Sequence, residues 1–172
     1  MVSGDGGRTS GIRRGRPRLL GPRRMDPAVA SDSPKKAAPS KTRVLFVCIG
    51  NSCRSQMAEA FARAYGSDIM WARSAGVSPA LIIQPLTKQV LGERNLSVDD
   101  HFPKGMEMVR DEPFDLVVNM SGFPLAIPAP RVVHWDVPDP IGQEETIYRE
   151  VAALIESLVM RLILELRTAS DT

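Results

Sequence analysis

A short apolar run, Val44 to Val47, leads directly into a polar loop and then into a helix-forming segment. A continuous run of this length is typical of a strand that is buried on both faces of a parallel sheet. The loop, Cys48 to Ser55, contains glycine, asparagine and serine, and the segment from Met57 to Tyr65 is rich in helix formers and stops at Gly66. A buried strand that is followed by a helix favours an α/β fold.

The rest of the chain repeats this alternation. We expect three more strands and two more helices, with strands at 69–73, 114–118 and 131–135 and helices at 85–93 and 144–167. The last helix is expected to bury one stripe of side chains, Ile147, Val151, Leu154, Leu158 and Leu162. These elements predict a three-layer α/β domain over 42–168, with a four-stranded parallel sheet flanked by helices and a tail at 169–172.

The charge of the chain divides near residue 41. Residues 1–41 carry ten Lys or Arg and three Asp, with six Gly, five Pro and no aromatic residue. Such a segment cannot bury enough apolar surface to offset its conformational entropy, so we predict a disordered basic extension over 1–41. A nucleic-acid-binding arm is the alternative, because four arginines are clustered at 13–18. Met25 is a candidate translation start, which would leave residues 1–24 untranslated.

The composition excludes several classes of protein. Cysteine occurs only at Cys48 and Cys53, so neither a disulfide-stapled secreted scaffold nor a four-cysteine zinc site is possible. No charge-free apolar stretch approaches the ~20 residues that a membrane span needs. The twin arginines at 13–14 and 23–24 lack the apolar core that follows them in an export signal. We therefore expect a cytoplasmic protein without a membrane partner, and nucleic acid is not its expected ligand.

The chemistry is concentrated in the loop from Cys48 to Ser55. Its residues between these two ends are Ile49, Gly50, Asn51, Ser52, Cys53 and Arg54. Between a buried strand and a helix, the backbone N–H groups of such a loop can turn inward and cradle an anion, and the helix adds the positive end of its dipole. Glycine and asparagine tolerate the positive φ angles that such a loop demands. The segment is therefore a predicted phosphate or oxyanion-binding P-loop.

Cys48 is the expected nucleophile of this loop. Helix N-termini and nearby cations favour the thiolate form of cysteine, which is the reactive form. Arg54 supplies a planar fork that can hold two oxygens of a tetrahedral anion, and Ser55 can donate a hydrogen bond to the thiolate. The competing interpretation is that Cys48 is a small hydrophobic residue at the end of a strand.

The segment 44–59, VLFVCIGNSCRSQMAE, closely resembles the active-site signature of the low-molecular-weight protein tyrosine phosphatase superfamily. The resemblance runs over about 43–167 and implies the fold of that superfamily. Within it, the GNSCRSQMAE stretch is most similar to the branch that contains the thiol-coupled arsenate reductases. The tyrosine phosphatase branch usually carries a bulky apolar residue where Ser52 stands and proline where Gln56 stands.

Cleavage of a phosphate ester through a thiolate also needs a proton donor for the leaving oxygen. The segment 135–142 follows the last predicted strand and should lie at the carboxyl edge of the sheet, where ligands of open α/β sheets bind. The resemblance implies that the acid belongs to an Asp-Pro pair in this loop, which is Asp139-Pro140 here. Asp136 is the alternative acid, and it could equally be a turn carboxylate.

The resemblance also implies a supporting network behind the loop, in which Asn51, Ser55 and Ser74 occupy the matching positions. Some arsenate reductases of the superfamily bind potassium through counterparts of Asn51, Glu59 and Ser74 together with an aspartate. Lys104 stands where we align that aspartate, and its ammonium could take the place of the ion. We therefore predict no metal and no cofactor.

The arsenate reductases that the chain resembles need further cysteines, which resolve the arsenate adduct and hand a disulfide to thioredoxin. Ser121 stands at the position of the first distal cysteine, and no cysteine follows Cys53. A serine hydroxyl cannot take part in disulfide exchange, so a self-contained three-cysteine relay is excluded. Cys53 is a candidate redox partner of Cys48, and its other interpretation is that it fills space behind the loop.

Three functions remain. The first is a cysteine-dependent phosphatase that acts on phosphate monoesters through Cys48, Arg54 and Asp139 by way of a cysteinyl-phosphate intermediate. The second is an arsenate reductase that uses an external small thiol or a thioredoxin-type reductant to resolve the Cys48 adduct. The third is a non-catalytic module that binds an oxyanion or a partner. We favour the phosphatase, because the residues that its chemistry needs are all present.

Overall fold

The computed structural model describes residues 40–170, and nearly all of the expected basic extension lies outside them. Eight elements follow one another along the chain: β1 (Thr42–Cys48), α1 (Arg54–Gly66), β2 (Met70–Gly76), α2 (Pro85–Gly92), a 3-10 turn η1 (Met106–Met108), β3 (Leu116–Asn119), β4 (Arg131–His134) and α3 (Glu145–Ser170). Every predicted strand and helix forms, with ends that move by up to three residues, and η1 was not expected. The last helix ends at Ser170, beyond the predicted end of the domain at 168.

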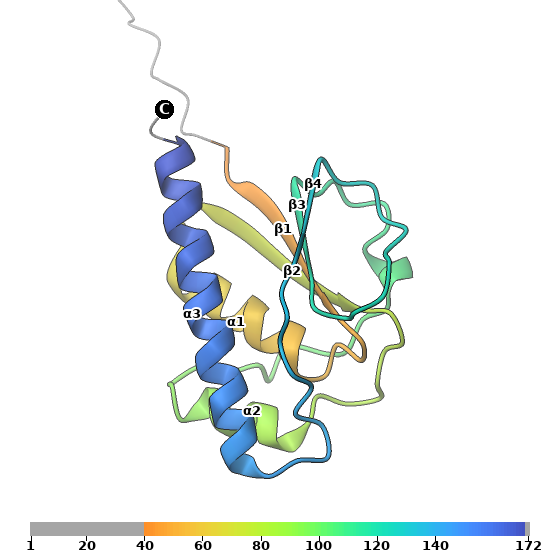
Figure 1. The fold of residues 1–172 in the computed structure, drawn as a ribbon, viewed down its shortest axis with the longest axis vertical. Coiled ribbons are helices and arrows are strands. Elements are labelled where there is room, and N and C mark those ends of the chain that lie inside the picture. The colour runs from red at the N-terminus through yellow and green to blue at the C-terminus, as the bar shows by residue number, and fades with distance from the viewer. Residues whose placement is uncertain (1–39, 171–172) are drawn as a thin grey trace, which may run out of the picture. The chain divides into compact units, whose positions relative to one another are not determined.

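The four strands form one parallel sheet in the order β2-β1-β3-β4, which confirms the predicted fold class (Figure 1). β1 lies in the interior of the sheet, and the residues from Val44 to Val47 are completely buried. Cys48 pairs with Gly76 at the end of β2, and Val47 pairs with Asn119 at the end of β3. The carboxyl ends of these strands therefore meet at one edge of the sheet.

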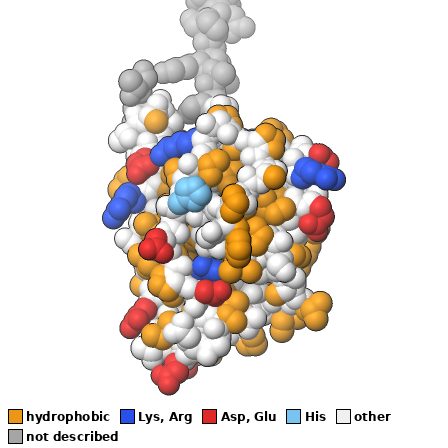
Figure 2. All heavy atoms as spheres, turned by 45° about the vertical axis from the view of Figure 1, so that its right-hand side comes forward, with side chains coloured by type: hydrophobic (Ala, Val, Ile, Leu, Met, Phe, Trp, Pro, Cys, Tyr) orange, Lys and Arg blue, Asp and Glu red, His pale blue; other side chains and the backbone are white. Residues whose placement is uncertain are grey.

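The two faces of the sheet are covered differently. All three α-helices pack on one face, against alternate residues of β1 such as Val44 and Phe46. The other face, which carries Leu45 and Val47, is covered by η1 and by the loop of residues 121–130. The third layer is thus built from one short turn and a loop. Figure 2 shows that hydrophobic side chains are exposed between polar ones on the face that it draws.

One predicted core position is wrong. Leu154 of α3 is 39% exposed, and Ile147 and Leu158 are only half-buried. The buried stripe consists of Tyr148, Val151, Ala152, Ile155, Val159, Leu162, Ile163 and Leu166. The prediction followed the largest aliphatic residues, whereas the helix turns a neighbouring stripe toward α1 that includes tyrosine and alanine. None of the helices within 40–170 is long and apolar enough to cross a membrane.

Candidate active site

The loop between β1 and α1 has the shape that an anion cradle requires. Asn51, Ser52 and Cys53 are buried, and Asn51 adopts the left-handed conformation with φ 48°, which asparagine tolerates better than most residues. Within residues 40–170, no protein group accepts a hydrogen bond from the backbone amides of these three residues. Those amides remain available to an anion, as the sequence predicts for this loop.

The segment that follows β2 is hydrogen-bonded along the outer side of the loop. Its amides donate to carbonyl oxygens of the loop in four bonds: Val77 to Cys48 at 3.1 Å, Ser78 to Ile49 at 2.9 Å, Ala80 to Gly50 at 2.9 Å and Gln84 to Ser52 at 3.0 Å. Gly76 makes this close approach possible, because a Cβ there would lie 2.6 Å from the carbonyl oxygen of Ile49. The carbonyls of the loop thus point toward residues 77–84, which leaves its amides to face the anion position.

A chain of side-chain hydrogen bonds ends on the sulfur of Cys48. The carboxylate of Glu59 can only accept, so the hydroxyl of Ser74 donates its proton to Glu59. The oxygen of Ser74 then accepts a hydrogen bond from Nδ2 of Asn51 at 2.9 Å. The same amide nitrogen donates to Oγ of Ser55 at 2.8 Å. The single proton of the Ser55 hydroxyl is then free to point at Sγ of Cys48, 3.0 Å away. This arrangement would stabilise a thiolate at Cys48.

Arg54 is fixed between the ends of β3 and β4. One of its terminal nitrogens donates to the carbonyl oxygens of Met120 at 2.9 Å and Val137 at 3.0 Å. The other donates to Oδ2 of Asp139 at 3.1 Å. The Arg54 side chain is only 7% exposed, so its guanidinium is held at the mouth of the cradle instead of moving in solvent.

The two candidate acids occupy different environments. Asp139 is half-buried, pairs with Arg54, and accepts a bond from the amide of Ile141 at 3.2 Å through its second oxygen. Gln143 steadies the same turn by donating to the carbonyl of Asp139 at 2.9 Å. Asp136 is exposed on the preceding stretch and lines a neighbouring hollow. The structure therefore pairs Asp139 with Arg54, whereas Asp136 lines the same hollow as Arg54 but is not hydrogen-bonded to it.

Lys104 lies beside Glu59, as the sequence alignment suggested. Its ammonium is 3.9 Å from Oε2 of Glu59 and donates to the carbonyl of Phe102 at 3.2 Å, and its backbone amide donates to Oδ1 of Asn51 at 2.8 Å. Burial lowers the pKa of Lys104, and the charge of Glu59 opposes that effect. No group of three or more His, Cys, Asp or Glu that could hold a metal ion occurs in the described part of the chain. The prediction that the site binds no metal stays a prediction.

Sequence reasoning missed Gln56 and His101. Nε2 of Gln56 donates to both the backbone oxygen and Oδ1 of Asn51, each at 3.1 Å. Oε1 of Gln56 lies 2.9 Å from Nδ1 of His101, so that ring nitrogen is the donor. In the sequence, Gln56 serves only to distinguish branches of the superfamily. No local sequence pattern reveals that the Gln56 amide is completely buried in the first turn of α1, where it positions Asn51.

Cys53 is a poor match for a redox partner. It is 1% exposed, and burial raises the pKa of its thiol to about 12. Both cysteines are free thiols in the structure. A thiol that is held in its protonated form attacks sulfur slowly, so the burial of Cys53 favours the interpretation that it fills space behind the loop, and its redox role stays a prediction.

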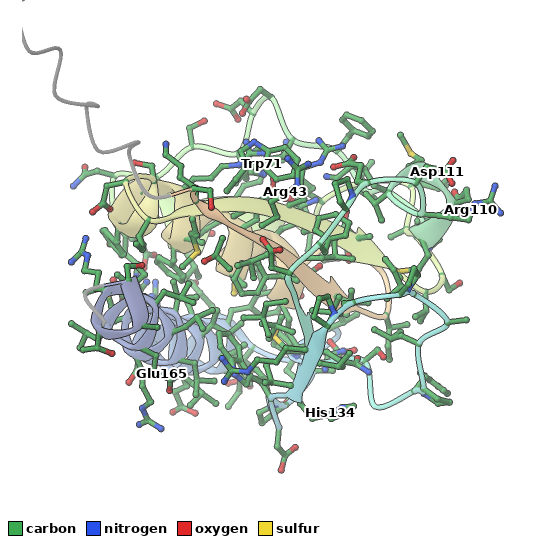
Figure 3. The ribbon with its side chains drawn as sticks, turned by 90° about the horizontal axis from the view of Figure 1, so that it is seen from above. Arg43, Trp71, Arg110, Asp111, His134 and Glu165 are labelled. Carbon is green, nitrogen blue, oxygen red and sulfur yellow. The ribbon has the colours of Figure 1, made fainter. Side chains whose placement is uncertain are left out.

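A hollow of about 340 Å³ opens beside Arg54. Its lining comes from the ends of β3 and β4 and the residues that follow them: Arg54, Asn119, Met120, Ser121, Gly122, His134, Trp135, Asp136 and Val137. His134, labelled in Figure 3, lies in β4 at the edge of the sheet. Ser121, which stands where the resembled reductases carry a cysteine, donates to Oδ1 of Asn119 at 2.7 Å. Its hydroxyl is thus part of the wall of this hollow.

Known proteins are similar to this chain in sequence and in fold. Residues 43–125 match the family model described as low molecular weight phosphotyrosine protein phosphatase. Arsenate reductase 1 of Bacillus cereus is 33% identical over 117 residues, which cover 65% of this chain and 87% of the relative. The glutaredoxin arsenate reductase of Synechocystis is 29% identical over 126 residues, covering 70% of this chain and 95% of the relative.

Solved structures show the same fold. An arsenate reductase in its phosphate-binding state superposes with a TM-score of 0.66 at 27% identity, covering 73% of this chain and 98% of that one. The YwlE arginine phosphatase of Geobacillus stearothermophilus superposes with a TM-score of 0.65 at 28% identity, covering 74% and 94%. Both reductases and phosphatases are therefore built on the arrangement found here.

Proposed function

This chain belongs to the low molecular weight phosphotyrosine protein phosphatase family, and we propose that it is a cysteine-dependent phosphatase acting on phosphate monoesters. One observation carries the proposal: Cys48, Arg54 and Asp139 converge on a single anion loop, and Ser55 directs a hydrogen bond at the sulfur. These groups are a nucleophile, an oxyanion clamp and an acid, which suffice for hydrolysis without a second reactive thiol.

In the first step, the phosphate group enters the loop and binds the free amides and Arg54. The thiolate of Cys48 attacks phosphorus, and the bond between phosphorus and the ester oxygen breaks. Asp139, in its protonated form, gives its proton to the departing oxygen, so the alcohol or phenol leaves neutral. The product is a cysteinyl-phosphate at Cys48 and an ionised Asp139.

In the second step, the Asp139 carboxylate removes a proton from a water molecule that attacks the same phosphorus. The bond between sulfur and phosphorus breaks, inorganic phosphate leaves, and the electron pair returns to Cys48 as a thiolate. The Ser55 hydroxyl stabilises this leaving thiolate as well as the attacking one. The cycle restores both residues to their starting protonation states.

The test is hydrolysis of p-nitrophenyl phosphate by wild type and by Cys48→Ser, with phosphotyrosine and phosphoarginine peptides as further substrates. We expect turnover by wild type and loss of turnover in Cys48→Ser, while inorganic phosphate still binds the variant. A Cys48→Ser variant that kept a tenth of the wild-type rate would overturn the assignment of the nucleophile. Hydrolysis of the phosphotyrosine peptide is expected for an enzyme that acts on phosphate monoesters, whereas hydrolysis of phosphoarginine, which is a phosphoramidate, would match the arginine phosphatase named above.

Arsenate reduction with an external thiol is the second candidate. Two observations favour it: the curated relatives above are named arsenate reductases, and the hollow beside Arg54 gives room for a second reactant. The external thiol would attack the sulfur of the Cys48–arsenic adduct, arsenite would leave with the electrons of that bond, and a mixed disulfide would remain. A second external thiol would then release Cys48. Arsenite formation from arsenate with glutathione, with other small thiols and with a thioredoxin-type protein tests this candidate directly.

A further inference from the structure

Exposed apolar side chains stand next to the anion loop. Leu81 is 98% exposed and Ile82 is 61% exposed. They lie between Ala80 and Gln84, whose amides are bonded to the carbonyls of Gly50 and Ser52 of the loop. Hydrogen bonds to the anion loop thus fix the backbone on both sides of Leu81 and Ile82, which keeps these two side chains close to the loop.

Two further exposed apolar residues lie beside Asp139 and beside the hollow next to Arg54. Ile141 is 45% exposed and donates its amide to Asp139. Phe123 is 55% exposed, and its backbone is bonded to Ser121 in the wall of the hollow beside Arg54. We call Leu81, Ile82, Phe123 and Ile141 the apolar rim. Figure 2 shows hydrophobic side chains gathered on the side of the molecule to which the loops after β3 and β4 belong.

The loop segments that carry the apolar rim contain no charged residue, and this limits which substrates could bind there. None of the residues at 77–84, 121–130 or 140–143 is charged. A free metabolite with several phosphate or carboxylate groups would find no cation in these loops for its additional charges. An apolar group that flanks a single phosphate would instead cover side chains that are otherwise exposed to water.

We propose that the apolar rim docks protein segments in which the phosphorylated residue is flanked by apolar side chains. The proposal rests on the phosphatase function and specifies its substrate class. Once the phosphate lies in the cradle, the neighbouring residues of the same segment must pass over Leu81 and Ile82 on one side or over Ile141 on the other. The cradle therefore binds the phosphate, and the apolar rim contacts the residues that flank the phosphorylated residue.

The experiment compares kcat/KM for two phosphotyrosine peptides of equal length, one with Leu and Val beside the phosphotyrosine and one with Ser and Gly. p-Nitrophenyl phosphate is the reference substrate, because it carries no flanking residues. We expect wild type to prefer the apolar peptide by about tenfold or more, and Leu81→Ser/Ile82→Ser to lose that preference. Leu81→Met/Ile82→Val should retain it, because an apolar surface remains.

Leu164→Ser is the matched control, since Leu164 is 58% exposed on the C-terminal part of α3, at the end of the sheet opposite the cradle. Leu164→Ser should leave the ratio of kcat/KM between the two peptides unchanged. Equal kcat/KM values for the two peptides in wild type would overturn the proposal, as would a preference that survives in Leu81→Ser/Ile82→Ser. A higher kcat/KM for a short-chain alkyl phosphate than for the apolar peptide would also overturn it, because the rim would then serve a lipid.

The result is separable from the phosphatase proposal. Binding of both peptides to Cys48→Ser is measured by fluorescence anisotropy, which needs no turnover. If wild type hydrolyses nothing but Cys48→Ser still binds the apolar peptide about tenfold more tightly, the docking surface stands and the hydrolase assignment falls. If p-nitrophenyl phosphate is hydrolysed and the peptides bind equally, the docking surface falls and the hydrolase stands.

Discussion

Asn51 is the residue on which most hydrogen bonds of the site converge. Its side chain donates to Ser55 and Ser74 and accepts from Gln56 and the amide of Lys104, so all four of its hydrogen-bonding positions are used. Its backbone is in the left-handed region, which bends the loop around the anion position. Asn51 thus sets both the curve of the cradle and the direction of the Ser55 hydroxyl.

At the same scale, the structure makes the roles of the two aspartates testable. We expect Asp139→Asn to lower kcat by roughly 10²–10⁴ for an alkyl phosphate, which needs a proton on its leaving oxygen. The loss should be much smaller for p-nitrophenyl phosphate in the burst phase, because its leaving group is already a weak base. Asp136→Asn is the control and should change either rate less than twofold, a modest effect on the scale of acid catalysis. A larger loss from Asp136→Asn would reassign the acid.

Cys53 gives a second prediction at the residue scale. A pKa of about 12 leaves roughly one thiol in 10⁴ to 10⁵ ionised at pH 7.5. After inactivation with peroxide, wild type and Cys53→Ala should therefore recover equal activity with dithiothreitol, since Cys53 would not trap an oxidised Cys48. Mass spectrometry of the oxidised wild type is expected to show no loss of two hydrogens between the peptides of Cys48 and Cys53. Better recovery of wild type would restore the redox interpretation.

At the scale of elements, the meeting of β2 with the anion loop leaves no room for a side chain. A Cβ at Gly76 would lie 2.7 Å from the amide nitrogen of Asn51 as well as against the carbonyl of Ile49, and both are backbone atoms. Gly76→Ala should lower the free energy of unfolding by about 1–3 kcal/mol and weaken phosphate binding, because the loop must move. Gly92→Ala is the control, since no atom lies within 4 Å of its added Cβ. Denaturant titration and phosphate binding by calorimetry measure both effects.

The elements also show what could be predicted from the sequence. The apolar run before Cys48 and the helix formers after Ser55 identified the strand, loop and helix of the site, because these signals are local. The Asn51 network was only partly predictable, since His101 joins it across 45 residues from Gln56 and no local pattern marks such a contact. The 3-10 turn at Met106–Met108 is too short to leave a periodic signal.

At the scale of the whole molecule, His101 links stability to pH. It faces Arg63, Glu59, Asp100 and Lys104, and burial is the main cause of its lowered pKa. The unfolded chain therefore binds a proton at His101 more readily than the folded one. Its contribution to stability is fully present above the ordinary value of 6.5 and is lost as the pH falls from 6.5 through the lowered pKa of the folded state.

We expect the free energy of unfolding to drop more between pH 7.5 and pH 5.5 in wild type than in His101→Asn. His134→Asn is the control, because His134 is exposed on β4 and should leave the pH dependence of wild type unchanged. Urea titrations of the three proteins at both pH values give the comparison. A drop of the same size in His101→Asn and wild type would show that other groups carry the dependence.

The hydrogen bond between Arg54 and Asp139 also affects how the product is released from the site. The carboxylate occupies one of the guanidinium nitrogens that an incoming oxyanion needs, so it acts as a tethered competitor with a high effective concentration. Every anion that enters must displace this carboxylate, and after each turnover Asp139 must release the proton that it took from water before it pairs with Arg54 again. We therefore expect free phosphate to be a weak inhibitor, and replacing Asp139 with asparagine should strengthen inhibition by phosphate even as it slows catalysis.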